Sequence, residues 1–509
     1  MSASHGHAGR PPENPLPGAA AALDRAVSRG LAAVTGGALG RYQSAVVRIG
    51  MASTWLLFLL REFPHRDQLY GPGSAWGPDL AKSLIAGNHA FTVLLWNDGR
   101  GWFELCYALA VAASATLLLG WRTRTSALMF MIGVLSLQNR SVFMGDGGDN
   151  VVHIMAIYLA FTRCGQVWSL DSRRARRRAE ASAAAADPAD LAAPADPAHA
   201  SGAAVAEPAD PVGIALWVVL GGALVAATLA GRLSTGWGLV FWGCLAGQLL
   251  WWAVRRYAPG EPRTVMDIMG NVVHNGAMLV LAAEVCLVYS TAGWYKIQGS
   301  RWQDGTALYY PLHLDDFTPW PALSHALAGN GVLVMIISYG TVIVQVAFPF
   351  TLFNRRVKNV LLVGMMLEHA SIAVVLGLPF FSLAMIAADA VFLPTGFLLW
   401  LGWRLTSRPG RGAEARARSP GCRGRARPAT GQPGPSLGLG RSSTPFPARP
   451  GTPPSTRRTA RRRPARHPPD LRASAASAEV SGHGARSAPA PRPLRTLLRA
   501  GAVPRRRAP

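Results

Sequence analysis

Long apolar stretches alternate with short polar loops over most of the chain. A helix rises about 1.5 Å per residue, so roughly 20 apolar residues cross the hydrocarbon core of a bilayer. The third and fourth apolar stretches, at residues 125–138 and 150–164, are short, so we expect them to be tilted, broken or re-entrant. We predict an all-α polytopic integral membrane helix bundle with about ten transmembrane helices, at residues 44–60, 102–121, 125–138, 150–164, 212–230, 235–253, 272–293, 329–352, 359–377 and 380–401.

Polar segments divide the chain into five parts. Three of them contain too few large apolar residues to form a core, and we expect these to be a disordered N-terminus, a cytoplasmic linker rich in Ala, Pro and Asp, and a disordered tail rich in Arg and Pro. The other two are membrane halves of about four and about six helices. In chain order the parts are 1–40 (N-terminus), 41–171 (first half), 172–211 (linker), 212–405 (second half) and 406–509 (tail).

The net charge of +24 is concentrated in the tail. Residues 411–509 contain 22 arginines, no lysine and three acids, which leaves only +5 for everything before them. Such a tail could bind anionic lipid or nucleic acid electrostatically. Arginine without lysine or periodicity is also what out-of-frame translation of a GC-rich gene produces, and we favour this explanation. We therefore expect no specific nucleic-acid partner.

Clusters of positive residues orient the predicted spans. They follow the second, fourth, sixth and eighth spans, at residues 122–124, 173–178, 255–263 and 355–358. Loops rich in Lys and Arg stay on the cytoplasmic side. The pattern predicts a protein integral to the cell membrane, in contact with the lipid bilayer, with both termini in the cytoplasm.

Lys296 is the first candidate for chemistry. It lies where the seventh predicted span leaves the membrane, beside Trp294, Tyr295 and Trp302. A lysine among aromatic residues at this depth is typical of an interfacial anchor. The alternative is a lysine in a dry pocket, where burial lets it act as a base.

The segment GDGGDN, residues 145–150, is the second candidate, with His153 one turn further on. A glycine-rich turn with an acid, here Asp149 beside Asn150, can bind a cation, a phosphate or a quinone oxygen. It can equally be a tight turn between two spans.

Ionisable residues inside apolar segments form the third group. Each is costly in hydrocarbon, so each should face the bundle interior and find a partner. They serve either a functional site or hydrogen bonding between helices. The group consists of Glu104, His274, Glu284, Glu368, His369 and Asp389.

Known motifs of soluble enzymes are absent from the sequence. There is no nucleophile elbow, phosphate-binding loop, dinucleotide fingerprint, zinc HExxH or haem-attachment motif. The five cysteines occur singly and four lie in or beside apolar segments, which argues against a metal cluster or a disulfide framework.

Four segments resemble the horizontally transferred transmembrane (HTTM) domain, whose members are bacterial relatives of vitamin-K-dependent gamma-carboxylase. AGWYKIQGSRWQDGTALYY (292–310) is the most specific, and the resemblance covers about residues 40–400. The others are QNRSVFMGDGGDN (138–150), VWSLD (167–171) and LEHASIAVVLGLPFFSLAMI (367–386).

The resemblance implies quinol chemistry. In better-known relatives a reduced vitamin K reacts with oxygen to give an epoxide, and the strong base formed removes a proton from glutamate, which then captures carbon dioxide. The implied reactants here are O2 and a lipophilic reduced quinone, either menaquinol or vitamin K hydroquinone. Lys296 matches the family lysine that deprotonates the quinol; His369 and His153 correspond to family histidines. We expect these three as catalytic residues, and as substrate-binding residues Trp294, Tyr295, Trp302, Asp149, Asn150 and Glu368.

Two departures from the family narrow the expectation. Nothing here corresponds to the large β-rich region that docks the protein substrate of the animal carboxylase, which argues against protein carboxylation. Residues 172–270 also add two spans to the family pattern. We therefore expect a quinol oxygenase or epoxidase on the extracytoplasmic side. The alternative is a non-enzymatic membrane protein, a transporter or an assembly factor.

Overall fold

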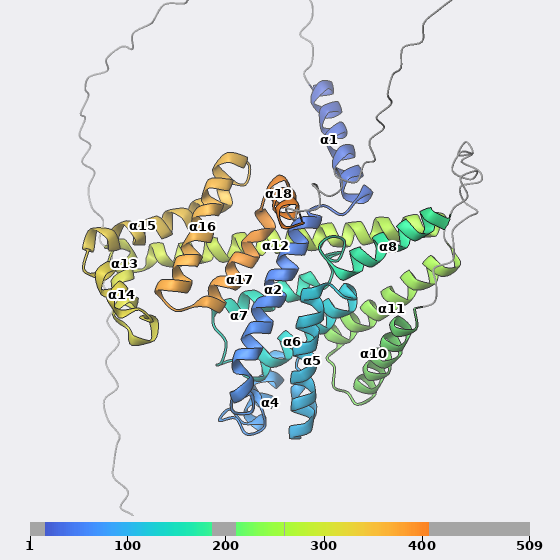
Figure 1. Ribbon diagram of the computed structural model, residues 1–509, viewed down its shortest axis with the longest axis horizontal. Helices are drawn as coiled ribbons and strands as arrows, with labels where there is room; N and C mark the ends of the chain where they lie inside the picture. Colours follow the sequence, from blue (N-terminus) through green and yellow to red (C-terminus); the bar gives the residue numbers. More distant parts are fainter. Residues whose placement is uncertain (1–15, 186–209, 259, 407–509) are drawn as a thin grey trace, which may run out of the picture. The chain divides into compact units, whose positions relative to one another are not determined.

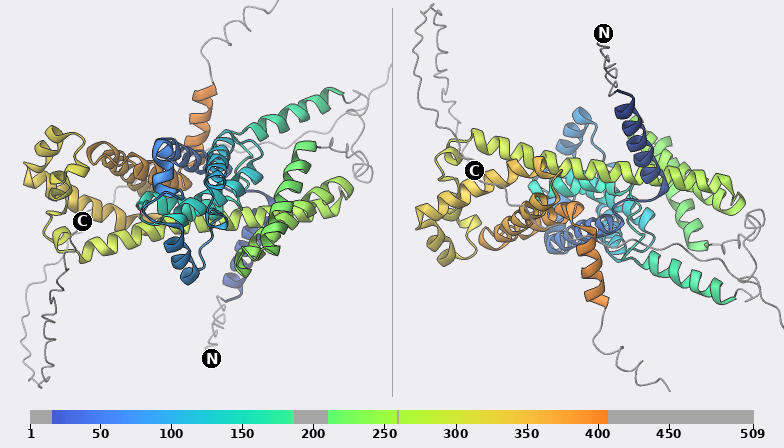
Figure 2. Two further views of the ribbon diagram at one scale, coloured as in Figure 1. Left: turned by 90° about the horizontal axis from the view of Figure 1, so that it is seen from below. Right: turned by 90° about the horizontal axis from the view of Figure 1, so that it is seen from above.

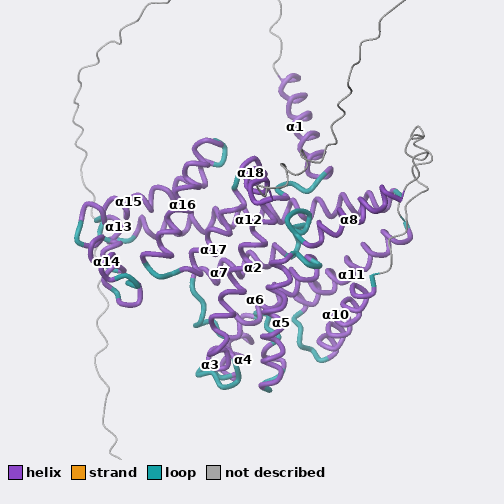
Figure 3. Tube along the Cα trace, in the orientation of Figure 1, coloured by secondary structure: helices purple, strands orange, loops and turns teal. Residues whose placement is uncertain are grey.

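The computed structural model describes residues 16–185, 210–258 and 260–406, which form helices and loops without a strand (Figures 1 and 3). The α-helices are α1 (Leu16–Gly36), α2 (Arg41–Glu62), α3 (Arg66–Tyr70), α4 (Pro78–Asn88), α5 (Arg100–Leu119), α6 (Thr123–Arg140), α7 (Gly147–Leu159), α8 (Leu170–Ala185), α10 (Pro211–Leu229), α11 (Thr235–Tyr257), α12 (Glu261–Gln298), α13 (Ser300–Gln303), α14 (Pro321–Ala328), α15 (Gly331–Ala347), α16 (Arg355–Val375), α17 (Pro379–Asp389) and α18 (Thr395–Thr406). Short 3-10 helices are η1 (Phe63–His65), η2 (Leu94–Trp96), η3 (Ala307–Tyr309), η4 (Pro311–His313), η5 (Asp315–Phe317), η6 (Phe348–Thr351) and η7 (Ala390–Phe392). The predicted disorder of residues 1–15, of 186–209 in the linker and of 407–509 falls outside the described residues.

Seven helices are long and apolar enough to cross a membrane, which makes the chain a membrane protein of helical class. They are α2 with its continuation to Tyr70, α5, α10, α11, α12, α15 with η6, and α16. The segments α17–η7 and α18 would form an eighth span, but they are bent by 115°. Proline has no backbone N–H and forces the preceding residue into an extended conformation, so Pro394 accounts for the break after Leu393.

The third and fourth predicted spans are helices of a different kind. The helix α6 occupies residues 123–140 but carries Ser, Gln, Asn and Arg side chains among its apolar ones, and it is not among the seven. The helix α7 has 13 residues, so it is about 20 Å long and too short to cross the hydrocarbon core. Both pack inside the bundle, where α6 contacts α5 and α7, and α7 contacts α17.

Two segments expected to be unstructured contain helices. Residues 16–36 of the predicted disordered N-terminus form α1, and α8 extends to Ala185 within the predicted linker. The last carbonyl groups of a helix lack partners within it, and α12 supplies donors to the end of α1. Asn275 Nδ2 donates to the carbonyls of Val34 (2.8 Å) and Gly37 (2.9 Å), and Asn271 Nδ2 donates to that of Thr35 (2.9 Å). These side-chain amides of α12 explain the order that composition alone did not predict.

The long helix α12 organises the bundle. It contacts α1, α7, α11, α15 and α17 along its length (Figures 1 and 2). Small residues allow the closest approaches. A Cβ atom at Gly293 of α12 would lie 2.6 Å from Cγ2 of Val346 on α15, and one at Gly50 of α2 would lie 2.4 Å from Cβ of Ala387 on α17. Such small-residue contacts are the usual way for helices to pack closely in membranes.

Arg48, fully buried on α2, fixes the end of α5. Its guanidinium donates to the carbonyls of Leu117 (2.6 Å), Leu118 (3.0 Å) and Trp168 (2.8 Å). The first two carbonyls belong to the last turn of α5, where carbonyl groups have no N–H partner within the helix. Gly120, at φ +69°, ends that helix in a conformation that glycine adopts without strain.

The helices α10 and α11 leave most of their surface uncovered. Within an apolar stretch of 18 residues in each helix, only 6% is buried inside the protein. Large apolar side chains such as Leu229, Leu239 and Val219 are 83%, 72% and 66% exposed. An uncovered apolar surface of this extent is expected where lipid is the solvent.

Candidate functional site

Lys296 lies near the end of α12 and points toward α15 rather than outward. Its Nζ donates to Oε1 of Gln345 on α15 (2.9 Å), and Gln345 Nε2 donates to Oε1 of Glu368 on α16 (2.6 Å). The Lys296 Nζ is also 5.3 Å from the centroid of the Trp302 ring. We call Lys296, Gln345 and Glu368 the lysine cluster. The close approach of α12 and α15 at Gly293 brings the lysine within reach of the glutamine.

A second polar group, the tyrosine triad, consists of Tyr289, His369 and Asp389. The hydroxyl of Tyr289 lies 3.0 Å from Nε2 of His369 and 3.0 Å from Oδ1 of Asp389. All three side chains are buried, being exposed by 2% or less. Within the described residues, His369 Nδ1 and Asp389 Oδ2 have no hydrogen-bond partner.

The hydroxyl of Tyr289 has one proton for two neighbours. If it donates to Asp389, His369 Nε2 must carry a proton to complete the other bond; if it donates to His369, Asp389 must carry one. Because an unpaired charge is costly in a buried site, the triad has to share its protons among the three groups. Such an arrangement can pass a proton from one side chain to another.

The two groups are adjacent in the structure. Glu368 and His369 are consecutive on α16, and Tyr289 and Lys296 are seven residues apart on α12. Seven residues make two helical turns, so Tyr289 and Lys296 lie on the same face, about 10 Å apart along the axis.

His153 of α7 lines a separate cavity of about 120 Å³ with Asp149, Asn150, Gln138 and the apolar side chains of α2, among them Trp55. Gln138 Nε2 donates to the carbonyl of Asp149 (2.8 Å), so its Oε1 faces His153 Nδ1 at 2.8 Å. Since Oε1 can only accept, His153 Nδ1 carries the hydrogen. In the neutral ring Nε2 is then left as an acceptor.

The GDGGDN turn is fixed by its own acids. The Asp146 side chain accepts from the backbone N–H groups of Gly148 (2.6 Å) and Asp149 (3.0 Å), and Asp149 Oδ2 accepts from the Asp146 N–H (3.0 Å). This reciprocal pair is a capping box at the start of α7. Both carboxylates are thus used in holding the turn that presents Asn150 and His153 to the cavity.

Phe381 of α17 contacts both the turn before α7 and the tyrosine triad. Its ring centroid is 5.6 Å from that of His369, in an edge-to-face arrangement. A Cβ atom on Gly148 would lie 2.6 Å from the Phe381 Cα, and one on Gly147 would lie 3.2 Å from its ring. The glycines therefore let the turn before α7 pack directly on α17, and Phe381 contacts both candidate regions.

Other residues predicted from the sequence lie elsewhere. Trp294 and Tyr295 are 61% and 74% exposed and do not face the lysine cluster, whereas Trp302 does. Glu104 forms an ion pair with Arg66 (2.9 Å). His274 bridges the Arg163 N–H and the carbonyl of Leu39, which makes it a structural residue.

Tyr289, Gln345 and Gln138 were not among the residues predicted from the sequence. Tyr289 could have been found from its position two turns before Lys296, on the same helical face. Gln345 is a polar residue inside the apolar run VIVQVAF, which is the same kind of signal as an intramembrane acid.

No protein-family model, no curated protein and no solved structure matches this chain.

Proposed function

We propose that the chain is a membrane enzyme that oxidises a lipophilic quinol with O2 to a quinone epoxide. The proposal is supported by the inward-facing lysine cluster beside the buried tyrosine triad, because an amine that could act as a base lies near hydrogen-bonded groups that could pass on its proton. We assign quinol oxidation to this arrangement because residues 292–310 resemble the HTTM domain.

The reaction consumes one quinol and one O2 and forms one epoxide and one water. Two electrons come from oxidation of the quinol to the quinone level, and two more from insertion of one oxygen atom into the ring double bond. The other oxygen atom leaves as water with the two quinol protons. A base is needed to start the reaction, since the quinol reacts with O2 as its anion.

Lys296 is assigned the role of that base, with Gln345 and Glu368 orienting its amine through hydrogen bonds of 2.9 and 2.6 Å. His369 receives or returns protons through Tyr289 and Asp389. His153 and Asn150 bind quinone oxygens from the 120 Å³ cavity. We place this site in the extracytoplasmic half of the membrane, with both termini in the cytoplasm, on the strength of the loop charges.

Turnover by the purified protein in nanodiscs tests the proposal. Menaquinol or vitamin K hydroquinone is supplied with O2, and epoxide is followed by mass spectrometry in wild type, Lys296→Ala and Lys82→Ala. General bases contribute roughly 10²- to 10⁴-fold, so Lys296→Ala should lose at least about 10²-fold in rate. Lys82 lies on α4 in an exposed ion pair with Asp98, and its loss should leave the rate unchanged.

The tyrosine triad also favours a second candidate, a proton-coupled transporter. A buried Tyr, His and Asp in hydrogen-bond contact is a common arrangement for moving protons through a membrane. Under this function, no epoxide forms with either quinol, and protein reconstituted in vesicles dissipates a pH gradient in a manner that depends on His369 but not on Lys296.

A further inference from the structure

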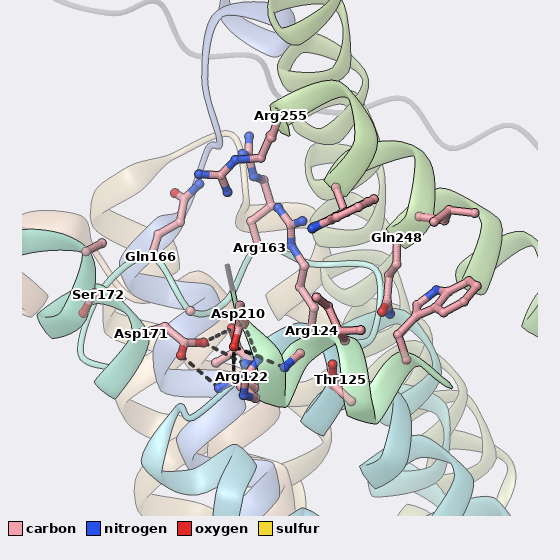
Figure 4. Close-up of a pocket in the computed structure, with 18 of the residues that line it drawn as sticks. Arg122, Arg124, Thr125, Arg163, Gln166, Asp171, Ser172, Asp210, Gln248 and Arg255 are labelled. Carbon is pink, nitrogen blue, oxygen red and sulfur yellow. Dashed lines mark hydrogen bonds and ion pairs between the residues drawn. The ribbon is translucent and has the colours of Figure 1, made fainter. Parts of the chain in front are cut away.

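Away from the lysine cluster and the tyrosine triad, the bundle contains a cavity that the proposed quinol chemistry does not use. It has a volume of about 960 Å³ and is open to the surface between α6, α8, α10 and α11 (Figure 4). Five arginines line it together with two aspartates, an excess of three positive charges. The arginines are Arg41, Arg122, Arg124, Arg163 and Arg255.

These arginines come from four loops or helix ends that are far apart in the sequence, the first of them Arg41 at the start of α2. Arg122 and Arg124 precede or begin α6, Arg163 follows α7, and Arg255 ends α11. Figure 4 shows the side chains of Arg122, Arg124, Arg163 and Arg255 at the same cavity. The like charges would repel one another, so an arrangement that collects them is stabilised by an anion.

The acids of the cavity are already occupied. Asp171 accepts from the backbone N–H groups of Arg122 (2.9 Å) and Thr123 (2.7 Å), where it caps the start of α6. Asp210 caps α10 and pairs with Arg122 (2.7 Å), and this pairing lowers the pKa of the Asp210 carboxyl.

The side chain of Arg124 is available to a ligand. Its guanidinium lies 4.3 Å from the centroid of the Trp251 ring, and it forms no hydrogen bond or ion pair with any residue that the structure describes. The aromatic face supports the cation and leaves all of its N–H groups to donate elsewhere. One guanidinium can donate two parallel hydrogen bonds to two oxygens of the same phosphate. A phosphate is therefore the anion best matched to this cavity.

The basic cavity continues into an apolar one. A second cavity of about 210 Å³ lies between α5, α6, α10 and α11, and its walls include Leu109, Ile132, Leu220, Leu224 and Phe241. The two cavities share Thr125, Gly213, Trp217 and Gln248, so they meet at these residues. A site that is basic at one end and apolar at the other fits an amphiphile rather than a free anion.

We propose that this composite cavity binds one anionic phospholipid, with its phosphate on Arg124 and Arg122 and an acyl chain between α5, α6, α10 and α11; Arg163, which is already paired with Asp267 (3.0 Å), adds positive charge nearby. The uncovered apolar faces of α10 and α11 give a lipid direct access from the bilayer. Basic pockets between transmembrane helices are a known mode of binding for lipid headgroups on the cytoplasmic side.

Native mass spectrometry of the delipidated full chain tests the proposal. Phosphatidylglycerol is titrated against phosphatidylcholine with the same acyl chains, and inorganic phosphate is added as a competitor. We expect one phosphatidylglycerol per chain, bound at least about tenfold more tightly than phosphatidylcholine, and no displacement by millimolar phosphate. Equal binding of the two lipids, or displacement of the lipid by phosphate alone, would overturn the proposal.

Variants separate the two ends of the site. Arg124→Gln should weaken phosphatidylglycerol binding about tenfold, as expected for the loss of a charge-assisted hydrogen bond, whereas Arg174→Gln on the exposed face of α8 should not. Ala223→Phe, which fills the apolar cavity, should also weaken it. Unchanged binding in both Arg124→Gln and Ala223→Phe would place the lipid elsewhere.

If Arg124→Gln fails to fold, a variant that is expected to increase the affinity for the lipid still tests the proposal. Asp210→Asn removes the carboxylate that pairs with Arg122 and keeps a side chain that caps α10 well. It should tighten phosphatidylglycerol binding, because Arg122 is released toward the phosphate. Weaker binding in a folded Asp210→Asn protein would contradict the assignment of Arg122 to the headgroup.

Discussion

The hydroxyl of Tyr289 lies 3.0 Å from Nε2 of His369 and is the only contact through which His369 joins Asp389 among the described hydrogen bonds. Tyr289→Phe keeps the ring and removes this hydroxyl. It leaves the Asp389 carboxyl and the imidazole unsatisfied in a buried site, which costs about 1–3 kcal/mol. The thermal midpoint of the detergent-solubilised protein should fall. Tyr309→Phe, at a tyrosine that is 46% exposed, should leave it unchanged, and a stable Tyr289→Phe protein would argue that water or lipid already satisfies the triad.

Gly293 sets the distance between α12 and α15. Gly293→Leu forces the side chain against Val346, whose Cγ2 is 2.6 Å from the Cβ position. Overpacking of this kind costs typically 1–3 kcal/mol and should pull Lys296 away from Gln345. Gly276→Leu on the same helix is the matched control, because its Cβ position has nothing within 4 Å. Equal effects of the two substitutions on the thermal midpoint would show that the contact with Val346 does not matter.

Arg48 tests how the end of α5 is held. Arg48→Met keeps much of the side-chain volume but removes the donor to the carbonyls of Leu118 and Trp168 and one of the two donors to that of Leu117, which keeps the Gly120 N–H. Loss of hydrogen bonds from a charged donor to buried carbonyls should destabilise the protein by about 3 kcal/mol. Arg29→Met, on the exposed face of α1, should have little effect on the same denaturation curve, and similar midpoints for both variants would contradict the role given to Arg48.

His153 is predicted to bind substrate rather than to support the fold. His153→Leu removes the Nε2 acceptor that faces the cavity and leaves the capping box of Asp146 and Asp149 intact, but it also removes the Nδ1–H that donates to Gln138 Oε1. The KM for the quinol should rise about tenfold, as for one lost hydrogen bond to the substrate, while the thermal midpoint falls only by the loss of the bond to Gln138. His65→Leu, at an exposed histidine, is the control. A collapse of expression in His153→Leu, with normal His65→Leu, would make His153 a structural residue.

The apolar runs in the sequence were enough to predict the helical class and most of the long helices. The predicted spans 102–121, 212–230 and 235–253 correspond to α5, α10 and α11. The runs could not predict that α7 stops at Leu159, or that Pro394 breaks the last span by 115°. They also missed α1, since its order depends on amides of α12 more than 230 residues away.

The candidate site was predictable only in part. Lys296, Glu368 and His369 come together as expected of costly polar groups in apolar helices. Trp294 and Tyr295 were grouped with Lys296 because they adjoin it in sequence. Successive helical residues point about 100° apart, so the neighbours of an inward-facing lysine face outward. Applied to residues 289–296, helical periodicity separates the inward-facing Tyr289 and Lys296 from the outward-facing Trp294 and Tyr295.

Isotope labelling tests whether the protein oxidises a quinol to its epoxide with O2. The purified protein in nanodiscs is given quinol and ¹⁸O2, and the products of wild type and Lys296→Ala are resolved by mass spectrometry. We expect one ¹⁸O atom in each quinone epoxide and the other in water, with epoxide formation reduced at least about 10²-fold in the variant. If a well-folded wild-type protein forms no labelled epoxide from either quinol, or forms it equally without Lys296, the chain is not a lysine-dependent quinol oxygenase.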